Sequence, residues 1–447
     1  MLISAKWVLP IDKEPIEDGS ILIDDGKIKA IGKTEKLVKK YKKESQIDTG
    51  LSAILPGFVD CHTHLEYSVF RGVCDDLSFG EWKIQQQEKS KHLTKTDWQL
   101  SARLGAQEAL RSGITTIADI TDKSDILEVI KEAGLRARVF FEVYGLKDDA
   151  KKIDTASKAI DDWKKRTKGS LVKVGISPHA AYTTSPQLLK KVAALAEKKK
   201  LLSCVHVSGS MDEYNFVKYG SGPLAHRFKE LLGWNDVLWQ PMGTSPVKYL
   251  AQWDVFKTPT IAAHCIHVDE QDLDVLVKNK VKIVHCPRCA SKLGMGIAPL
   301  KKFKQRGLQI GIGTDSPASN NTMDLFEEMR HSLLLQRAHT QSMDGLAAQD
   351  FVRMATLGGA EVLDLEKKIG SLTPGKRADL IAVDLSQSYQ LPAPDPYSAV
   401  VYTCSSADVL LTVIDGKIRF NKSDSEQLDE KIYTGVNKLR KKLASAK

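Results

Sequence analysis

Eight short runs rich in β-branched residues alternate with longer amphipathic stretches between residue 54 and about residue 370. This alternation is typical of βα units arranged around a parallel sheet. Eight strands, each followed by a helix, over roughly 320 residues predict an α/β fold, a (β/α)8 barrel of the TIM type. The predicted strands are residues 54–61, 115–120, 137–144, 172–177, 202–207, 260–265, 281–286 and 308–313.

The two ends of the chain have a different pattern, with short apolar runs separated by tight turns. Asp25-Gly26 and Asp415-Gly416 each stand between such runs, which is the signature of a two-residue β-hairpin turn. We therefore expect residues 1–53 and 372–420 to form one small β-sandwich domain, packed on a barrel of residues 54–371. Residues 421–447 are predicted to form a C-terminal helical tail.

Composition and charge favour an ordinary cytoplasmic protein. The first residues contain too short an apolar run for a signal peptide, and nowhere do 18 apolar residues follow one another, so no membrane partner is expected. The formal charge is +9, but the lysine clusters are dispersed and lack an accompanying aromatic or glycine pattern. They are interpreted as solvated surface, and no nucleic-acid partner is expected.

The cysteines favour reduced thiols. Their number, seven, is odd, and the chain is long, so a disulfide framework is not expected. Cys286 and Cys289 form a lone CxxC pair. A zinc ribbon needs a second pair, so this pair is interpreted as buried small residues.

The ends of the predicted strands carry many ionisable side chains. Six of the 11 histidines lie there, and in a barrel of this type the C-terminal strand ends hold the catalytic groups. A metal site explains such a cluster better than six separate structural histidines. The side chains at this rim are His62, His64, Asp119, Glu142, His179, His206, His264, His285 and Asp315.

Four of these residues are candidate metal ligands. His62 and His64 are two residues apart, so on an extended strand both imidazoles point to the same face. His206 and Asp315, at the ends of the fifth and eighth strands, complete the set. Three histidines and an aspartate suit one divalent metal, zinc, with iron or manganese also compatible. The fourth strand ends at His179 without a bridging Lys or Glu, which favours one metal over two.

The expected chemistry is hydrolysis at an sp² carbon. A metal of this kind lowers the pKa of a bound water towards roughly 7 and so provides a nucleophile. Asp315 can accept the proton of that water and pass it to a leaving group such as ammonia. His264 can hold the water or the developing oxyanion by a hydrogen bond.

These residues also carry a family resemblance. The segments PGFVDCHTHL at 56–65, AHC at 263–265, GTDSPASN at 313–320 and GSLTPGKRADL at 370–380 resemble the amidohydrolase superfamily, in its deaminase and chlorohydrolase branch. Within that branch, HLEY at 64–67, SPHAAYT at 177–183 and YGSGPL at 219–224 are most similar to aminodeoxyfutalosine deaminases of menaquinone biosynthesis. Methylthioadenosine and S-adenosylhomocysteine deaminases come next.

The resemblance implies a nucleoside-like substrate, from which the 6-amino group of an adenine leaves as ammonia. It implies that His264 is catalytic and that His179 contacts the ribose. Glu66, Trp82 and Ser319 are the further substrate-binding candidates. For Glu66 and Trp82, surface charge and an ordinary core aromatic remain equally open interpretations. A homodimer is the assembly kept open.

The chain departs from the branch at three places on the rim. The branch has a proton-transferring Glu three residues after the histidine of the fifth strand, where this chain has Gly209. Ala181 replaces a usual Pro, and Cys289-Ala290 replaces Ser-Asn. Two alternatives therefore stay open, a catalytically weakened or silent relative and a hydrolase of a C–Cl or amide bond.

Gly209 sets a specific expectation. Weak deamination is expected, with Gly209→Glu raising it at least about tenfold. Asp212 and Glu213 follow within one helical turn, but either can replace the missing carboxylate only if the loop folds back.

Overall fold

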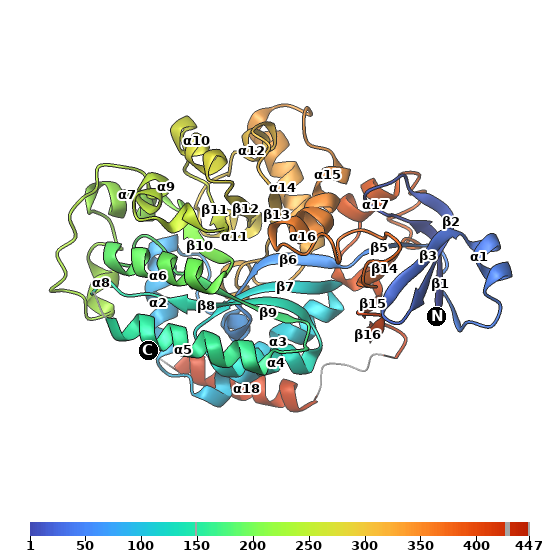
Figure 1. Cartoon of the computed structure of the whole chain (residues 1–447), viewed down its shortest axis with the longest axis horizontal. Helices are drawn as coiled ribbons and strands as arrows, with labels where there is room; N and C mark the ends of the chain where they lie inside the picture. The colour runs from blue at the N-terminus through green and yellow to red at the C-terminus, as the bar shows by residue number, and fades with distance from the viewer. Residues whose placement is uncertain (148–149, 425–429, 446–447) are drawn as a thin grey trace.

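The computed structural model describes residues 1–147, 150–424 and 430–445 and combines a barrel with a mixed β-sheet at one end (Figure 1). The barrel strands pair in parallel and in chain order, from β6 to β13. They are β6 (Phe58–Thr63), β7 (Ile114–Thr121), β8 (Arg136–Val143), β9 (Val172–Pro178), β10 (Ser203–Val207), β11 (Thr260–His264), β12 (Lys282–His285) and β13 (Ile310–Ile312).

The first and last barrel strands, β6 and β13, meet where the candidate active site lies. Thr63 and Asp315 form an isolated parallel bridge, and the backbone N–H of Asp315 donates to the carbonyl oxygen of His62 at 2.8 Å. The predicted (β/α)8 barrel is confirmed, and its closure brings the residue after β13 next to the end of β6.

The first predicted strand, residues 54–61, is divided into two at Gly57. β5 (Ser52–Pro56) belongs to the mixed sheet, whereas β6 begins at Phe58. Gly57 packs against the next barrel strand so closely that a Cβ atom there would lie 2.1 Å from Cγ2 of Thr115. The prediction of a single strand was therefore wrong at this point, because a close approach of the backbone lets the chain pass from one sheet to the other.

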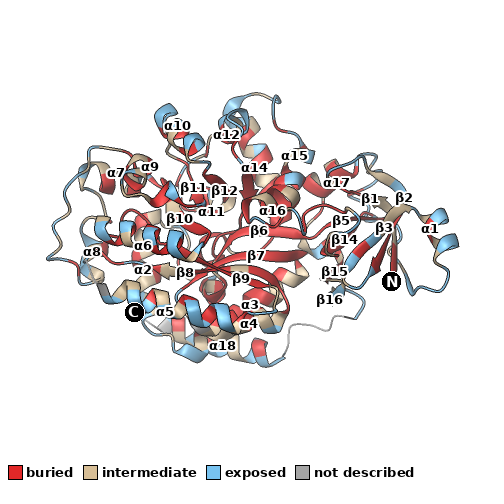
Figure 2. Cartoon of the chain, in the orientation of Figure 1, coloured by how far each residue is buried: buried red, intermediate tan, exposed pale blue. Residues whose placement is uncertain are grey.

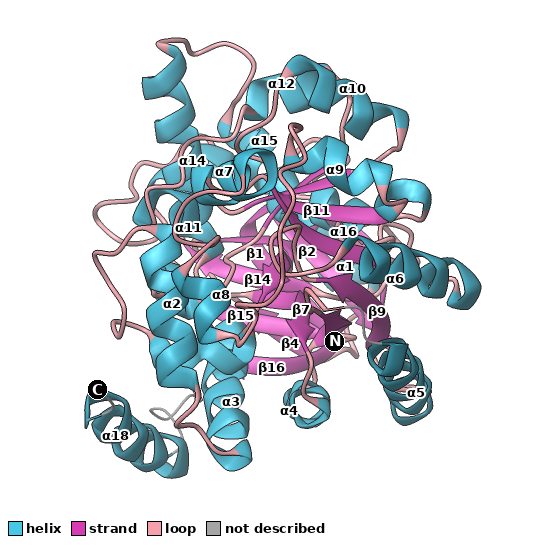
Figure 3. Cartoon of the chain, turned by 90° about the vertical axis from the view of Figure 1, so that its left-hand side faces the viewer, coloured by secondary structure: helices cyan, strands magenta, loops and turns pink. Residues whose placement is uncertain are grey.

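Helices surround the barrel strands (Figure 3), and the strands themselves are buried (Figure 2). None of the described helices is both long and apolar enough to cross a membrane. The helices are α1 (Thr34–Lys40), α2 (Phe79–Ser90), α3 (Lys95–Arg111), α4 (Ser124–Ala133), α5 (Ala150–Arg166), α6 (Pro186–Lys199), α7 (Met211–Tyr219), α8 (Arg227–Leu231), α9 (Pro246–Gln252), α10 (Glu270–Lys278), α11 (Pro287–Lys292), α12 (Leu300–Gln305), α13 (Pro317–Asn320), α14 (Leu325–Thr340), α15 (Ala348–Arg353), α16 (Gly359–Val362), α17 (Pro396–Tyr402) and α18 (Glu430–Ser445), with the short 3₁₀ helices η1 (Leu65–Phe70), η2 (Val255–Lys257) and η4 (Ser406–Asp408) and the π-helical turn η3 (Met354–Gly358).

The two ends of the chain pair with each other, as predicted, and they do so in one mixed sheet. Its strand order is β16-β15-β14-β5-β1-β2-β3, with β4 paired to β1, and the antiparallel β5–β14 pair joins the N-terminal to the C-terminal part. The strands are β1 (Leu2–Val8), β2 (Ile16–Asp24), β3 (Lys27–Lys33), β4 (Gln46–Asp48), β5, β14 (Leu380–Asp384), β15 (Val409–Ile414) and β16 (Lys417–Asn421).

Both predicted hairpin turns are present. Asp25 and Gly26 have φ values of 46° and 68°, and Asp415 and Gly416 have 55° and 76°. Two consecutive left-handed residues are what a type I′ hairpin turn requires, and Asp-Gly supplies them at low cost. The domain limits at residues 53, 371 and 420 stay predictions. The predicted tail contains α18, and its residues 425–429 and 446–447 lie outside the described residues.

A buried ion pair joins the barrel to the mixed sheet. Arg136, at the start of β8, donates from Nε to Oδ2 of Asp379 at 2.6 Å and from Nη2 to Oδ1 at 2.9 Å. The same Nη2 donates to Asp415 in the β15–β16 turn at 3.3 Å. The C-terminal strands are therefore tied to the barrel as well as to the N-terminal strands.

Candidate active site

Five side chains converge at the carboxyl ends of the barrel strands. His62 lies in β6 and His64 directly after it, while His206 lies in β10, His264 ends β11 and Asp315 follows β13. His62 forms one group with His206 and His264 and another with His64 and Asp315. Within each group, the possible ligand atoms lie within 4.8 Å of one another. The rim that the sequence predicted therefore contains a cluster of nitrogen and carboxylate donors.

In two of these rings, a backbone carbonyl oxygen contacts Nδ1, so Nε2 remains available to the cluster. Nδ1 of His64 lies 3.1 Å from the carbonyl oxygen of Ile120, and Nδ1 of His206 lies 2.7 Å from that of His179. Such contacts fix the orientation of metal-binding imidazoles and leave Nε2 for a ligand. Both nitrogens of His62 are buried and have no hydrogen-bond partner among the described residues. Because buried polar atoms normally have partners, this donor set fits a divalent metal.

Three histidines of the cluster, His64, His206 and His264, are neutral at neutral pH. Burial lowers the pKa of His64 to about 3 and that of His264 to about 4. Burial, reinforced by the neighbouring imidazoles, also holds the pKa of His206 well below its ordinary value. A neutral imidazole keeps the lone pair that a metal ligand needs.

Asp315 presents its two carboxylate oxygens to different neighbours. Oδ1 lies 3.5 Å from Nε2 of His62 and 3.8 Å from Nε2 of His64. Oδ2 accepts hydrogen bonds from Sγ of Cys289 at 2.8 Å and from Oγ of Ser319 at 3.1 Å. Burial by itself would raise the pKa of Asp315, but the adjacent imidazoles, that of His62 first, hold it well below its usual range. The carboxylate is therefore ionised.

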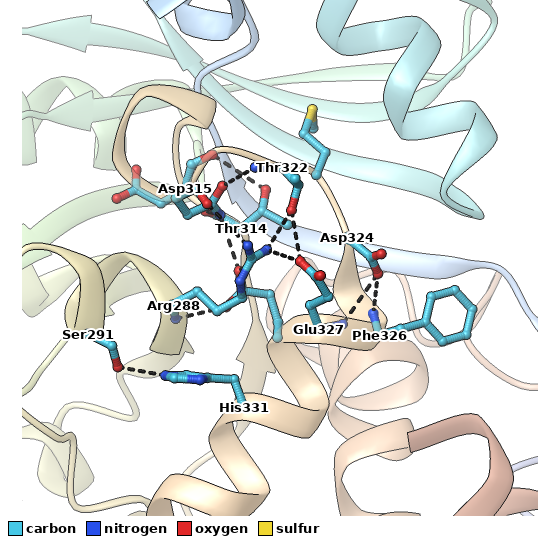
Figure 4. A network of polar contacts seen from close by, with 12 residues as sticks. Arg288, Ser291, Thr314, Asp315, Thr322, Asp324, Phe326, Glu327 and His331 are labelled. Atoms are coloured by element: carbon cyan, nitrogen blue, oxygen red, sulfur yellow. Dashed lines mark hydrogen bonds and ion pairs between the residues drawn. The ribbon is translucent and has the colours of Figure 1, made fainter. Parts of the chain in front are cut away.

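Arg288 anchors the segment that follows Asp315 (Figure 4). Its guanidinium donates to Oγ1 of Thr322 at 2.6 Å and to the carbonyl oxygen of Asn320 at 3.2 Å. It also lies 2.7 Å from Oε2 of Glu327 in α14. These contacts hold the segment between β13 and α14. Asp315 is therefore positioned by strand β13 before it and by the Arg288 contacts after it.

A cavity adjoins the cluster. His64, His206, His264 and Asp315 line it together with residues of α2 and of the loop after β9. Trp82 and His179, two of the substrate-binding candidates, are among the lining residues.

The two candidates are held in different ways. Nε1 of Trp82 donates to the carbonyl oxygen of Ala318 at 3.2 Å, and Nδ1 of His179 lies 2.7 Å from Oγ1 of Thr183. Each ring is thus oriented by a contact outside the cavity.

Glu66 lies in a neighbouring cavity of about 300 Å³, which Tyr67, Lys83 and His179 also line. Its Oε1 accepts a hydrogen bond from Thr121 at 2.7 Å and lies 3.5 Å from Nζ of Lys123. The side chain is 2% exposed, so the alternative of an ordinary surface charge does not describe it.

Ser319 and His285 are buried but are not among the residues that line the first cavity. Ser319 contacts Asp315 through its hydroxyl. Nε2 of His285 lies 2.8 Å from Oγ of Ser332 in α14. Five of the six rim histidines therefore surround the site, and the sixth serves the packing of a helix.

Three further ionisable side chains line the two cavities: Lys83 was not singled out from the sequence, Glu142 was placed at the rim without a role, and Glu213 was weighed only as a replacement for the carboxylate missing at Gly209. Lys83, on α2, and Glu213, on α7, line the first cavity, and Glu142, near the end of β8, lines the second together with Lys83. Burial raises the pKa of Glu142 to about 8 and that of Glu213 to about 7, and it lowers the pKa of Lys83. Glu142 could be singled out because it lies at the end of a predicted strand, where the catalytic groups of such a barrel gather. Lys83 and Glu213 lie on helices, where no comparable rule indicates functional residues.

Comparisons with known proteins identify one family. The model of the Amidohydrolase family matches residues 53–419. A 5-methylthioadenosine/S-adenosylhomocysteine deaminase of Pelotomaculum thermopropionicum is 35% identical over 419 residues, which cover 92% of this chain and 91% of the relative.

Two solved structures have a similar fold. A zinc-bound adenosine deaminase of Xanthomonas campestris is 25% identical with a TM-score of 0.85, over 99% of this chain and 98% of that one. The aminofutalosine deaminase of Helicobacter pylori, in complex with methylthio-coformycin, is 23% identical with a TM-score of 0.80, over 93% of this chain and 99% of that one.

Proposed function

The chain belongs to the amidohydrolase family, and we propose that it is a metal-dependent hydrolase that removes the amino group of an adenine-nucleoside-like substrate. The observation that carries this proposal is the group of imidazoles gathered around the Asp315 carboxylate, with an adjoining cavity. Support also comes from the Pelotomaculum relative, a deaminase that matches nearly the whole chain.

The proposed ligands are His62, His64, His206 and Asp315, holding one divalent ion. Zinc is the proposed metal, since the adenosine deaminase of similar fold contains it, and iron or manganese accept the same donors. A divalent metal held by such a set activates water as a nucleophile at neutral pH.

Asp315 and His264 are the proposed catalytic residues of this centre. The ionised carboxylate of Asp315 can take a proton from the attacking water and deliver it to the amino group, which leaves as ammonia. Nδ1 of His264 is buried without a partner among the described residues, so the neutral ring has a polar atom left for the water or the oxygen that develops on the substrate.

The substrate side of the cavity combines an aromatic ring with polar groups. Trp82 offers an apolar surface for a planar base, and His179 is the proposed ribose contact. Lys83 and Glu142 supply a donor and an acceptor where the two cavities adjoin, as recognition of sugar hydroxyls requires. We propose that Glu66 binds the substrate from the second cavity.

Ser319 remains a substrate-binding candidate. Its hydrogen bond to Oδ2 of Asp315 favours an action through that carboxylate.

Methylthioadenosine or S-adenosylhomocysteine is the favoured substrate class, because the 35% identity to their deaminase exceeds the 23% identity to the aminofutalosine deaminase. An aminodeoxyfutalosine-type substrate, and with it a place in menaquinone biosynthesis, stays a prediction. A homodimer also stays a prediction. We propose the cytoplasm as the location because all seven cysteines are free thiols.

The test is a mass-spectrometric screen of the purified, metal-analysed protein for replacement of an amino group by oxygen. The panel contains methylthioadenosine, S-adenosylhomocysteine, adenosine and 5′-deoxyadenosine, with cytosine and guanine as bases of other shape. We expect turnover of adenine nucleosides and none of the free bases. A metal-loaded protein that releases no ammonia from any adenine nucleoside would contradict the proposal.

The same screen, extended by a chlorinated purine and an amide, addresses the two alternatives. Chloride release from a chlorinated purine, or cleavage of an amide, without deamination would favour a hydrolase of another bond. Full metal occupancy with no turnover of any compound would favour a silent relative.

A further inference from the structure

A carboxyl group from α7 enters the cavity next to Gly209. Glu213 is 2% exposed and lines the same cavity as His206, His264 and Asp315. Its Oε2 accepts a hydrogen bond from the backbone N–H of Gly209 at 2.8 Å. Its Oε1 is buried and has no hydrogen-bond partner among the described residues. The structure therefore holds the carboxyl group by one oxygen and leaves the other without a hydrogen-bond partner among the described residues.

The loop after β10 folds back to put this group there. Ser208 has a φ of 48°, and its carbonyl oxygen accepts hydrogen bonds from Ile266 and His267, both at 3.0 Å. Ser210 then caps α7 by accepting from the backbone N–H of Glu213 at 3.2 Å. The left-handed residue reverses the chain, so a helix residue seven positions after His206 lies beside the strand end.

A purely structural role accounts for only part of this arrangement. A Glu at the third position of a serine-capped helix commonly turns back to a backbone N–H near the cap, as Glu213 does. Such a cap is satisfied equally well at the surface. A buried carboxyl group with an unpartnered oxygen is costly, and it is retained where a ligand or a reaction uses it.

Gly209 makes room for the Glu213 carboxyl group. A Cβ atom at position 209 would lie 3.1 Å from Cε of Met295 and 3.3 Å from Cδ2 of His264. The backbone here is packed against the site, so a long side chain at position 209 would compete with the Glu213 carboxyl group for the same part of the cavity.

We propose that Glu213 is the acid–base residue that exchanges a proton with the ring nitrogen of the substrate, a role that rests on the proposed deaminase function. As the oxygen of water bonds to C6, Asp315 accepts one proton of that water, and the carboxylic acid of Glu213 gives its proton to N1. The C6–N bond then breaks. The proton on Asp315 goes to the departing amino group, which leaves as ammonia. The proton of the C6 hydroxyl returns to Glu213, so both carboxyl groups regain their starting states.

The protonation state of Glu213 agrees with this role. Burial raises its pKa to about 7, although hydrogen bonds from the Gly209 and Ser208 backbone act in the opposite direction. Both forms are then populated near neutral pH, which suits a group that gives and regains a proton in each cycle. The charge of Glu213 also acts on Tyr182 and Cys265, whose pKa values it helps to raise.

The experiment compares Glu213→Gln with the wild-type protein. Glutamine keeps the size and the acceptor oxygen for Gly209 but cannot exchange a proton. Glu197→Gln on the exposed face of α6 is the matched control. Circular dichroism and metal content establish that each variant folds and binds metal, and Glu213→Asp, which retains a carboxyl group, is the second variant.

We expect Glu213→Gln to lower kcat about 10²-fold or more with little change in KM, because proton transfer of this kind is worth about 10² to 10⁴ in rate. The decline of kcat above neutral pH should disappear in Glu213→Gln and persist in Glu213→Asp. The infrared difference between the wild type and Glu213→Gln should contain a protonated carboxyl band that titrates near neutral pH, whereas the bands of other buried carboxyl groups, such as Glu142, are shared by both proteins.

A metal-loaded Glu213→Gln protein that keeps wild-type kcat and pH profile would overturn the assignment while leaving the proposed function intact. A carboxyl band that titrates in the ordinary range of glutamic acid would overturn it too. A wild-type protein inactive on every nucleoside would contradict the proposed function itself and the role of Glu213 with it.

Discussion

The thiol of Cys289 donates a hydrogen bond to Oδ2 of Asp315 across 2.8 Å. Ser319 donates to the same oxygen, so Oδ1 is the atom left facing His62 and His64. The lone CxxC pair therefore contributes one cysteine that orients a proposed metal ligand, although neither cysteine is itself a proposed ligand.

We expect Cys289→Ala to weaken metal binding about 10- to 100-fold, because partners that orient a ligand typically contribute this much. Cys289→Ser keeps a donor and should retain affinity within about threefold. Competition against a chromogenic zinc chelator measures both. If Cys289→Ala binds metal as tightly as the wild type, the Ser319 hydroxyl alone suffices to orient the carboxylate.

His62→Ala and Asp315→Ala should each abolish stoichiometric metal binding, since each removes a donor from the centre of the cluster. Metal bound only to the native state stabilises it by about 2.7 kcal/mol when present at 100 times its Kd. Added zinc should therefore raise the Tm of the stripped wild-type protein but not that of either variant. Metal analysis and thermal unfolding test this, with the exposed His92→Ala as control. A purified wild-type protein that binds no metal at micromolar concentration would refute the site.

Glu142→Gln should impair ribonucleosides more than their 2′-deoxy analogues. A hydrogen bond to a charged group contributes about 1.5–3 kcal/mol, so above about pH 8, where Glu142 is ionised, kcat/KM should fall about 10- to 100-fold for a substrate with both hydroxyls. Steady-state kinetics on adenosine and 2′-deoxyadenosine provide the comparison. Equal losses on both substrates would place Glu142 away from the sugar.

Asp379→Ala should lower the free energy of unfolding by about 3–5 kcal/mol. The substitution leaves Arg136, only 6% exposed, without its bidentate partner, and removing one partner of a buried pair typically costs this much. Glu270→Ala, which breaks exposed pairs with Lys302 and Arg306, should cost no more than about 1 kcal/mol per pair. Urea unfolding at matched metal content measures both. Similar losses in the two variants would mean that the Arg136 pair does not join the two parts of the fold.

Glu213→Gln should change stability in a pH-dependent way. The folded protein holds the proton of Glu213 with a pKa of about 7, above the ordinary value of 4.5, so it binds this proton more tightly than the unfolded chain does. Wild-type stability is therefore lost as the pH rises from about 4.5 to about 7, and glutamine removes that loss. From about pH 5 to about pH 8, the free energy of unfolding of the variant should therefore rise by about 2–3 kcal/mol relative to that of the wild type. Denaturant midpoints at both pH values test this, and a parallel dependence in the two proteins would contradict the raised pKa.

The periodicity of the sequence accounts for much of what was predicted correctly. Strand runs that alternate with helices predict a barrel. Because the C-terminal strand ends of such a barrel meet at one rim, His62, His64, His206 and Asp315 could be placed together before any contact was known. The Asp-Gly turns at 25–26 and 415–416 predicted the two hairpins for an equally local reason. The division at Gly57 was missed because the hydrophobic run continues through it. Only the close approach to Thr115 separates β5 from β6.

The sequence by itself determined the barrel, the shared sheet of the two chain ends and the positions of the candidate ligands, because strand periodicity and turn chemistry act between near neighbours. Only the tertiary structure decided that His285 serves helix packing, that Cys289 and Ser319 hold Asp315, and that Glu213 enters the cavity beside Gly209. The direction of a side chain in a loop or at the start of a helix depends on backbone reversals, such as the left-handed Ser208, and on segments far away in the sequence. Such contacts have no periodic signal, so the sequence could name Asp212 and Glu213 as neighbours of Gly209 but could not show which of them enters the cavity.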